Sequence, residues 1–222
     1  MIRPIRISLP TGEVCLADLD LPVRPFSVEM PVESEIGFGK GRYLLGRAAV
    51  EPERGFVGIE TALEYYRLTN RRALRQGIEN LMTINGEAEY LMASVLEKGR
   101  ADAVHVYFPD PWPKVRHRRR RLFEPQSLDL LLAMLRPGGR LFFATDHAAY
   151  GERVVEILRG HPVLEVEVLA GPWSDGPRTN YEAKYEIEGR PIRRLIATLT
   201  RCTGADLVHP DGRCAMVTGW GG

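Results

Sequence analysis

A glycine-rich segment near the start of the chain carries the first residues that could bind a small molecule. It runs Glu35-Ile36-Gly37-Phe38-Gly39-Lys40-Gly41, between an expected strand at 32–36 and an expected helix at 41–50. Glycines at such a junction allow tight turns and close approach of a ligand. The spacing is GxGxG, not the GxGxxG of dinucleotide-binding loops. Glu35 would repel a pyrophosphate at the helix N-terminus but suits a ligand that carries an ammonium group. The alternative is a purely structural turn.

Two further acids follow expected strands in the same way. Glu60 ends the strand expected at 56–60, about twenty residues after the glycines, where an acid can accept hydrogen bonds from both ribose hydroxyls. Glu87 follows the strand expected at 81–85. In a doubly wound sheet these acids meet at the carboxyl ends of strands, where ligands bind. Together with Glu35 they indicate a ligand with an amino acid end, a ribose and a base, which describes S-adenosylmethionine. Solvated acids at strand ends are the alternative.

A stiff acidic loop and a run of cations come next. Asp110 lies between two prolines in Phe108-Pro109-Asp110-Pro111-Trp112-Pro113-Lys114, after the strand expected at 103–108. The prolines restrict this loop, so the carboxylate could act with little reorganisation. Residues 114–121 then hold six cations in eight positions without an acid, although the chain's net charge is only +1. Such a local positive patch indicates contact with a phosphate backbone, the alternative being a solvated face.

The rest of the chain supplies elements that could position these residues. Strands are expected at 32–36, 56–60, 81–85, 103–108, 140–145, 164–169 and 192–200, and helices at 41–50, 63–76, 87–97, 127–135 and 148–159. This alternation predicts βαβ units and a parallel sheet. Residues 1–31 contain five prolines and are expected to form an irregular or edge segment. Residues 32–200 are then the main domain, and 201–222 a loosely packed extension.

Composition narrows the class of protein. The chain has 222 residues, 44% of them hydrophobic and 27% charged, which is typical of a folded globular domain. No apolar run approaches the length of a membrane span, so no membrane partner is expected. The three cysteines are widely spread and lack CxxC spacing. They favour a reducing cytoplasmic setting and argue against a disulfide framework or a cysteine-based zinc site.

Five blocks resemble the bacterial tRNA (guanine-N7)-methyltransferases. They are EIGFGKG, GIE, FPDPWPKVRHRRRRL, LRPGGRLFFATD and TNYEAKYEIEGRPI, in the family's order and within residues 32–195. The resemblance implies an α/β, Rossmann-like class I methyltransferase fold, with a seven-stranded, mostly parallel sheet, helices on both faces and a reversed last hairpin. It also implies S-adenosylmethionine as methyl donor and N7 of the variable-loop guanine of tRNA, position 46 in tRNA numbering, as acceptor.

The resemblance also implies roles for single residues. Glu35, Glu60 and Glu87, with the loop glycines Gly37, Gly39 and Gly41, match the donor site, and Asp110 matches the donor-binding and catalytic aspartate. The residues that match the family's substrate-binding positions are Lys114, Asp146, Thr179, Asn180, Tyr181 and Glu182. The RNA-contacting segment is matched by Arg116, His117, Arg118, Arg119, Arg120 and Arg121. The resemblance implies no metal. A monomer or a homodimer is expected, with tRNA as the partner.

Two other classes of protein compete with this interpretation. One is a non-catalytic RNA-binding module on a methyltransferase-like fold, but a degenerate donor site would be expected to lose Glu35, Glu60 and Asp110. The other is a nicotinamide dehydrogenase, which the GxGxG spacing and the acid before the first glycine disfavour. Two segments depart from the family pattern, the proline-rich residues 1–31 and the tail at 202–222, so the sequence leaves the mode of tRNA docking open.

Overall fold

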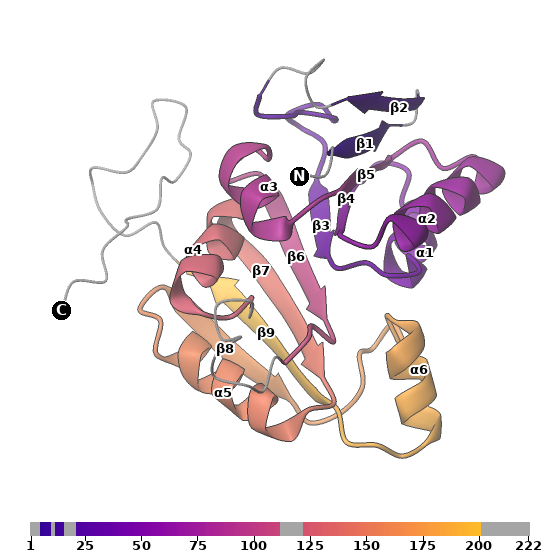
Figure 1. Ribbon diagram of the computed structural model, residues 1–222. Coiled ribbons are helices and arrows are strands. Elements are labelled where there is room, and N and C mark those ends of the chain that lie inside the picture. The colour runs from indigo at the N-terminus through magenta and orange to yellow at the C-terminus, as the bar shows by residue number, and fades with distance from the viewer. Residues whose placement is uncertain (1–4, 10–11, 16–20, 112–121, 201–222) are drawn as a thin grey trace.

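A single mixed β-sheet organises the computed structural model, which describes residues 5–9, 12–15, 21–111 and 122–200 (Figure 1). Its strand order is β2-β1-β5-β4-β3-β6-β7-β9-β8. The strands are β1 (Arg6–Leu9), β2 (Gly12–Cys15), β3 (Val32–Ile36), β4 (Gly55–Glu60), β5 (Leu81–Asn85), β6 (Ala101–Tyr107), β7 (Leu135–Thr145), β8 (Leu164–Leu169) and β9 (Arg193–Leu199). The helices are α1 (Arg42–Val50), α2 (Leu63–Gln76), α3 (Ala88–Ser94), α4 (Pro125–Met134), α5 (Ala148–Arg159) and α6 (Asn180–Ile187).

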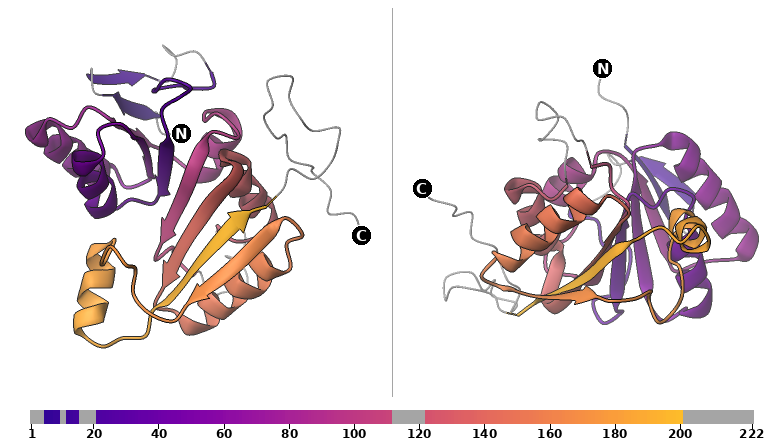
Figure 2. Two further views of the ribbon diagram at one scale, coloured as in Figure 1. Left: turned by 180° about the vertical axis from the view of Figure 1, so that it is seen from behind. Right: turned by 90° about the horizontal axis from the view of Figure 1, so that it is seen from below.

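The central strands are parallel and buried on both faces. β3 pairs in parallel with β4 and β6, while β5 and β7 extend the parallel sheet on either side. All residues of β4 and β5 are buried, because helices cover both faces and leave no solvated side. α1 and α2 pack on one face around Phe56 and Tyr66, and α3, α4 and α5 pack on the other around Leu91 and Leu132 (Figure 2).

The expected class I architecture is confirmed for the seven strands from β3 to β9. The last hairpin is reversed as expected, because β9 runs antiparallel to both β7 and β8. The order of the strands changes direction between β3 and β6, which lie side by side. In open α/β sheets this switch point leaves a crevice at the carboxyl ends of the strands, where ligands bind. The fold thus places the ends of β3 and β6 at the natural ligand site.

Within the described residues the sheet has nine strands, so the expectation of seven is corrected. The two additional strands, β1 and β2, form an antiparallel hairpin, and β1 pairs with β5. Ile7 is fully buried and anchors this hairpin to the core. Part of the proline-rich segment 1–31 therefore belongs to the same sheet as residues 32–200. The proposed extension at 201–222 lies outside the described residues.

Helix α6 is a second difference from the sequence-based prediction. The sequence analysis predicts no helix at 180–187, yet Thr179 caps α6 by accepting a hydrogen bond from the backbone N–H of Glu182 at 3.0 Å. This Thr-x-x-Glu spacing is the capping-box signal that starts many helices. β7 also begins earlier than expected, at Leu135, where the chain passes directly from α4 into the strand.

Candidate functional site

A large cavity opens at the carboxyl ends of β3, β4 and β6, beside the switch point. Its volume is about 1020 Å³, which can hold a nucleoside-sized ligand together with a second base. Most of the residues expected at the site line this cavity. They are Glu35, Gly37, Gly39, Glu60, Glu87, Asp110, Asp146, Thr179, Asn180 and Tyr181. Residues up to 146 positions apart in the sequence, Glu35 and Tyr181, therefore meet around one space, as the sheet topology predicts.

Glu35 is the most deeply buried acid of the cavity. Its side chain is 2% exposed, and its Oε2 atom has no hydrogen-bond partner among the described residues. Burial, together with the nearby charge of Glu60, raises the pKa of Glu35 to about 8. A buried carboxylate oxygen without a donor is costly unless a ligand supplies one. Glu35 therefore suits a cationic hydrogen-bond donor such as an ammonium group.

Glu60 links the glycine loop to the start of α2. Its Oε2 accepts from the backbone N–H of Gly39 at 2.8 Å, and its Oε1 accepts from the N–H of Ala62 at 2.8 Å. Each carboxylate oxygen can accept a second hydrogen bond. Oε1 also accepts from the Thr61 hydroxyl at 3.4 Å, a long contact that a ligand hydroxyl can replace. Glu60 thus fixes the loop backbone and can still accept from two adjacent hydroxyls, as a ribose presents them.

The three expected glycines serve different purposes. Gly37 and Gly39 line the cavity and have φ angles of 76° and 53°, in the left-handed region that favours glycine. Gly41 does not line the cavity, which differs from its expected role at the donor site. A Cβ atom at Gly41 would lie 2.6 Å from the side chain of Thr69, so the absence of a side chain lets α1 pack closely against α2.

The loop after β6 carries Asp110 into the cavity beside three aromatic rings. Phe108 has a φ of 50°, unusual for a bulky residue, and its N–H donates to the carbonyl of Ala144 at 2.7 Å. The ring centroids of Phe108 lie 6.3 Å from Tyr181 and 5.7 Å from Tyr185. Since Tyr181 is 59% exposed and lines the cavity, this aromatic cluster offers an open ring face for stacking.

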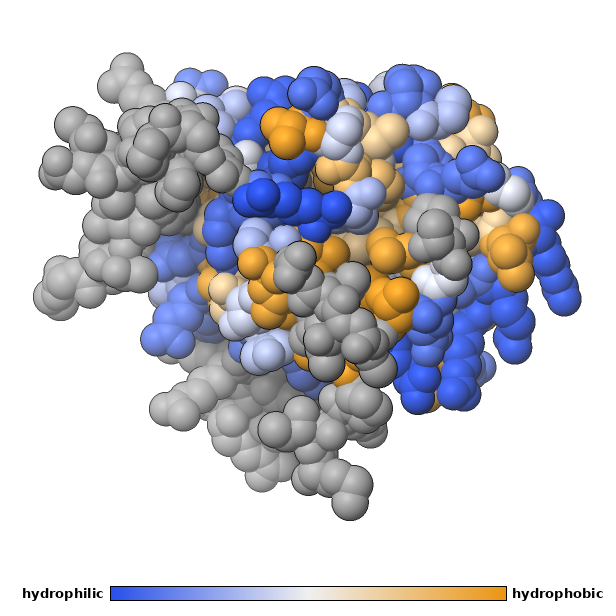
Figure 3. All heavy atoms as spheres, turned by 90° about the horizontal axis from the view of Figure 1, so that it is seen from above, coloured by the Kyte–Doolittle hydropathy of each residue, from blue (hydrophilic) through white to orange (hydrophobic). Residues whose placement is uncertain are grey.

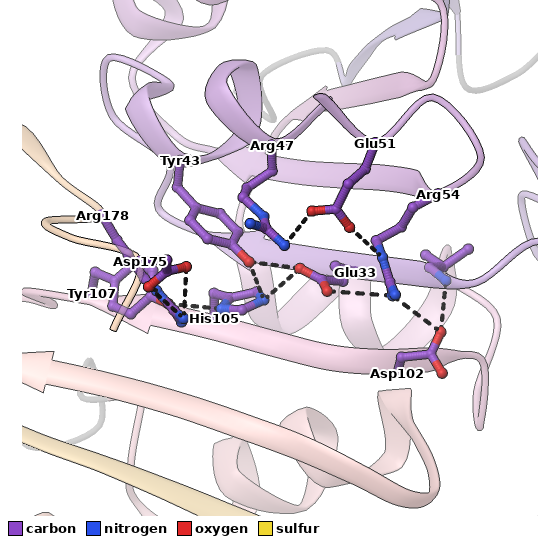
Figure 4. A network of polar contacts seen from close by, with 11 residues as sticks. Glu33, Tyr43, Arg47, Glu51, Arg54, Asp102, His105, Tyr107, Asp175 and Arg178 are labelled. Carbon is purple, nitrogen blue, oxygen red and sulfur yellow. Dashed lines mark hydrogen bonds and ion pairs between the residues drawn. The ribbon is translucent and has the colours of Figure 1, made fainter. Parts of the chain in front are cut away.

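A network of polar contacts beneath the cavity fixes Arg178, a residue that the sequence analysis missed (Figure 4). Its Nη1 donates to the Tyr107 hydroxyl at 2.7 Å, and its other nitrogens bind Asp175. The guanidinium carbon lies 4.4 Å from the ring centroid of Trp173 and 4.8 Å from that of Phe142. These contacts hold a cation at the cavity wall, where its charge acts on Glu35.

The network continues through the sheet from Tyr107 to Glu33. His105 contacts the Tyr107 hydroxyl through Nδ1 at 2.8 Å and Glu33 through Nε2 at 3.1 Å. Burial lowers the pKa of His105, which favours the neutral imidazole near pH 7. Burial raises the pKa of Glu33, but hydrogen bonds from His105 and Tyr43, together with the nearby charge of Arg54, bring the value down to about 2. Tyr107 is thereby held by partners on both sides of its hydroxyl.

Glu182 does not line the cavity, and its expected contact with substrate stays a prediction. Its side chain is fully buried, with Oε2 accepting from the backbone N–H of Arg178 at 2.7 Å and Oε1 accepting from Nε of Arg194 at 2.6 Å. Both oxygens are therefore used inside the protein. Glu182 holds the start of α6, while its neighbours Thr179, Asn180 and Tyr181 face the cavity.

The remaining expectations can be placed only in part. Lys114 and the run from Arg116 to Arg121, including His117, lie outside the described residues. The cavity is also lined by five residues that the sequence analysis does not predict there: Lys40, Arg42, Tyr65, Lys184 and Tyr185.

Within the described ranges, no cluster of three or more histidine, cysteine or acidic residues could hold a metal ion. No helix in that part of the chain is long and apolar enough to cross a membrane.

Comparison with known proteins identifies relatives over most of the chain. A family model described as a putative methyltransferase matches residues 29–195. The chain is 36% identical over 186 residues to the tRNA (guanine-N(7)-)-methyltransferase of Nitrosococcus oceani, covering 84% of this chain and 76% of the relative. It is 33% identical over 183 residues to the enzyme of the same name from Nocardia farcinica, covering 77% of this chain and 68% of that relative.

The fold has counterparts among solved structures. The crystal structure of the antibiotic-resistance methyltransferase Kmr superimposes with a TM-score of 0.59 and 19% sequence identity, over 88% of this chain and 99% of the other. At that identity the likeness concerns the fold alone. It supports the class I methyltransferase architecture derived above from the strand order.

Proposed function

The chain belongs to the family of tRNA (guanine-N(7)-)-methyltransferases, and we propose that it transfers a methyl group from S-adenosylmethionine to N7 of the variable-loop guanine, position 46, of tRNA. The observation that carries this proposal is the cavity at the switch point, lined by Glu35, Glu60, Glu87 and Asp110. One strand-end cavity thus holds partners for each part of the donor and an acid for the acceptor. The oligomeric state, monomer or homodimer, stays a prediction.

The residues present fit the proposed donor. Glu35 offers a buried carboxylate oxygen without a partner, which matches the ammonium of the methionine part. Glu60 offers lone pairs to the ribose hydroxyls, beside the backbone of Gly39. Glu87, at the N-cap of α3, lines the cavity directly after Gly86, whose N–H donates to the backbone carbonyl of Glu60 at 3.2 Å, and it would accept from the exocyclic amine of adenine. When bound, S-adenosylmethionine supplies an electrophilic methyl group on a sulfonium.

Guanine N7 needs orientation more than deprotonation. It has an in-plane lone pair and carries no proton at neutral pH, so no general base is required. The lone pair forms the new N–C bond while the C–S bond breaks and its electron pair stays on sulfur, giving S-adenosylhomocysteine and a cationic 7-methylguanine. The protein must align the three reacting atoms and exclude water, and such positioning can contribute about 7–11 kcal/mol.

Asp110 and the aromatic cluster are suited to this alignment. A carboxylate close to the base stabilises the positive charge that develops on the purine, and carboxylate oxygens can accept from guanine N1 and N2, which adenine cannot offer. Tyr181, Phe108 and Tyr185 present rings within 6.3 Å of one another between centroids, a surface on which a base can stack. For the base to reach these groups, it must leave its tertiary contacts in tRNA.

One experiment tests the proposal directly. The full chain is incubated with isotopically labelled S-adenosylmethionine and unmodified tRNA, and the tRNA is digested to nucleosides. We expect label in 7-methylguanosine, located at position 46 by sequence mapping, and none when that guanine is replaced by adenine. A calorimetric titration should show binding of S-adenosylmethionine but not of NAD. Donor binding without 7-methylguanosine would favour a non-catalytic RNA-binding module, and NAD binding would favour a dehydrogenase.

A further inference from the structure

Helix α2 presents a row of arginines that neither the donor site nor the cavity uses. Arg67, Arg71, Arg72 and Arg75 are all exposed, and residues 65–77 contain no acid. We call these four residues the α2 arginine ridge. From Arg67 to Arg75 the helix rises about 12 Å, so the ridge spans several phosphate positions of a nucleic acid strand.

The ridge begins at the mouth of the cavity. Tyr65 of α2 lines the cavity, and Arg72, two turns further on, lies within about 20° of Tyr65 around the helix axis. Arg72 also donates from Nη1 to the backbone carbonyl of Lys40 at 3.1 Å, and Lys40 itself lines the cavity. Arg71 and Arg67 follow further around the exposed side, so the ridge leads continuously away from the opening.

No described residue forms an ion pair with Arg67, Arg71 or Arg75, although many other arginines of the fold are paired, as Arg54 is with Glu33 and Glu51. Arg67 and Arg71, and again Arg71 and Arg75, are separated by four residues, a spacing at which like charges destabilise a helix. Arg75 is partly offset by the helix dipole at the C-terminal turn. Glu64 lies three residues before Arg67, but within the described residues no ion pair offsets the charge of Arg67 or Arg71.

The surroundings extend this positive surface. Lys40 and Arg42 are exposed at the start of α1, at the rim of the same opening. Figure 3 shows hydrophilic side chains gathered along the right-hand margin of the molecule, on the side where α2 lies in Figure 1. The whole chain has a net charge of only +1, so this concentration of cations is local.

We propose that the α2 arginine ridge binds the phosphate backbone of tRNA and guides the strand that carries the target guanine into the cavity. The inference rests on the proposed function, because it needs tRNA as the substrate. The cavity holds one base and the donor, so the rest of the tRNA must lie outside its mouth, where the ridge begins. Arginine suits phosphate oxygens through bidentate hydrogen bonds, and backbone contacts of this kind are independent of sequence.

The test compares two triple variants with equal loss of charge. The first combines Arg67→Gln, Arg71→Gln and Arg75→Gln, and leaves Arg72 with its bond to Lys40. The control combines Arg24→Gln, Arg136→Gln and Arg159→Gln, which are exposed arginines near the amino ends of the parallel strands, opposite the cavity. Affinity for unmodified tRNA is measured by fluorescence anisotropy at several salt concentrations. Affinity for S-adenosylmethionine and turnover at saturating tRNA are measured in parallel.

We expect the ridge variant to bind tRNA at least tenfold more weakly and to lose about 0.7–0.9 in the slope of log affinity against log salt for each contact removed. The donor affinity of the ridge variant and its turnover at saturating tRNA should match those of the parent. The control variant should change tRNA affinity by less than about twofold and keep a salt slope near the parental value. Equal losses in both variants, or an unchanged slope in the ridge variant, would overturn the inference.

Failure of this inference can be told apart from failure of the proposed function. If the parent forms 7-methylguanosine in tRNA but the ridge variant binds tRNA as tightly as the parent, only the ridge is wrongly assigned. If the parent forms no 7-methylguanosine, the proposed function itself fails. Binding of the parent to vesicles of anionic phospholipid, lost in the ridge variant while tRNA binding persists, would assign the ridge to a membrane surface and contradict the inference.

Discussion

The Oε1 atom of Glu182 accepts a hydrogen bond from Nε of Arg194 at 2.6 Å, and both side chains are buried, with 0% and 7% exposed. The pair joins α6 to β9, at the end of the sheet that forms the cavity. Through its second oxygen, Glu182 also holds the backbone N–H of Arg178. One carboxylate therefore fixes the segment that carries both Arg178 and the cavity-lining face of α6.

Replacing Glu182 by glutamine should destabilise the whole fold. The change leaves the Arg194 guanidinium without its buried counter-charge, and such a loss typically costs about 3–5 kcal/mol of stability. Glu186 should compensate in part, because its Oε1 lies 2.6 Å from Nη2 of Arg194. Urea denaturation measures the free energy of unfolding. Glu186→Gln is the matched control. Because the side chain of Glu186 is 30% exposed, this substitution should lower the free energy of unfolding by less. A stable Glu182→Gln variant that loses only tRNA affinity would instead support the substrate contact implied by the family resemblance.

Donor binding should depend on the protonation of Glu35. Because burial raises its pKa to about 8, the free protein holds Glu35 largely protonated at pH 7. The ammonium group of the donor binds the ionised form of Glu35 better than the protonated form. Donor affinity should therefore rise as the pH increases from 6 to 8, by up to about tenfold per pH unit while the pH is below the pKa of Glu35. Calorimetric titrations with S-adenosylmethionine at these pH values measure the effect. Glu35→Gln should bind weakly and show no such dependence on pH.

The same shift predicts how stability changes with pH. Between the ordinary pKa of 4.5 and the folded value of about 8, the folded protein holds a proton on Glu35 that the unfolded chain releases. This contribution to stability is complete below pH 4.5 and is lost as the pH rises toward 8. Glu35→Gln should therefore lose less stability than the parent between pH 5 and pH 8 in urea denaturation. Parallel losses in both proteins would contradict the raised pKa.

The sequence predicted the elements whose signals are local and missed those that depend on distant partners. Continuous apolar runs identified β4 and β5, and the glycine spacing placed the loop beside Glu35. The prolines of residues 1–31 predicted an irregular or edge segment, and the hairpin of β1 and β2 does lie at the edge of the sheet. Its two strands could not be located from the sequence, because burial of Ile7 against the sheet decides their place. α6 is short and polar, and although its capping-box spacing is readable in the sequence, the buried pairing of Glu182 with Arg194 that anchors the helix is not.

The residues of the candidate site also divide into those with a local sequence signal and those whose place depends on distant partners. Strand-end acids could be predicted because parallel strands bring their carboxyl ends to one edge of a sheet. Arg178 could not, because its place depends on Tyr107, Trp173 and Phe142, which belong to separate segments and only meet in the folded protein. Thr179 and Glu182 did carry a readable signal, since their spacing is that of a capping box.

Replacing Asp110 by asparagine should lower turnover while the fold and donor affinity persist. Asp110 is exposed on a loop that lines the cavity, so the isosteric change removes charge without opening a void. Loss of a carboxylate that faces the developing cation should slow methyl transfer by about tenfold or more, or ~1.4 kcal/mol. Single-turnover rates with saturating tRNA measure this step. A rate within about twofold of the parent, only ~0.4 kcal/mol, would remove Asp110 from the catalytic group.

The ring of Tyr181 should contribute to both binding and reaction of the base. It is 59% exposed, lines the cavity and lies 6.1 Å from Tyr185 between ring centroids. Stacking of a base on such a ring is worth about 1–3 kcal/mol, and the ring face also attracts the positive charge that the purine gains. We therefore expect Tyr181→Leu to raise the KM for tRNA and to lower kcat, whereas Tyr181→Phe keeps the ring and should retain most of both. Tyr90→Leu is the matched control, because Tyr90 is 51% exposed but does not line the cavity.

A tRNA with 2-aminopurine at the target position reports the stacking independently of turnover. Binding to the parent and to Tyr181→Phe should give the same fluorescence change, since either ring can receive the unstacked base, while Tyr181→Leu should leave the probe in a different, brighter state. Tyr90→Leu should behave as the parent does in both kinetics and fluorescence. If Tyr181→Leu matched the parent in fluorescence and in KM, the base would not stack on this ring, and the open face of the aromatic cluster would have to be sought at Phe108 or Tyr185.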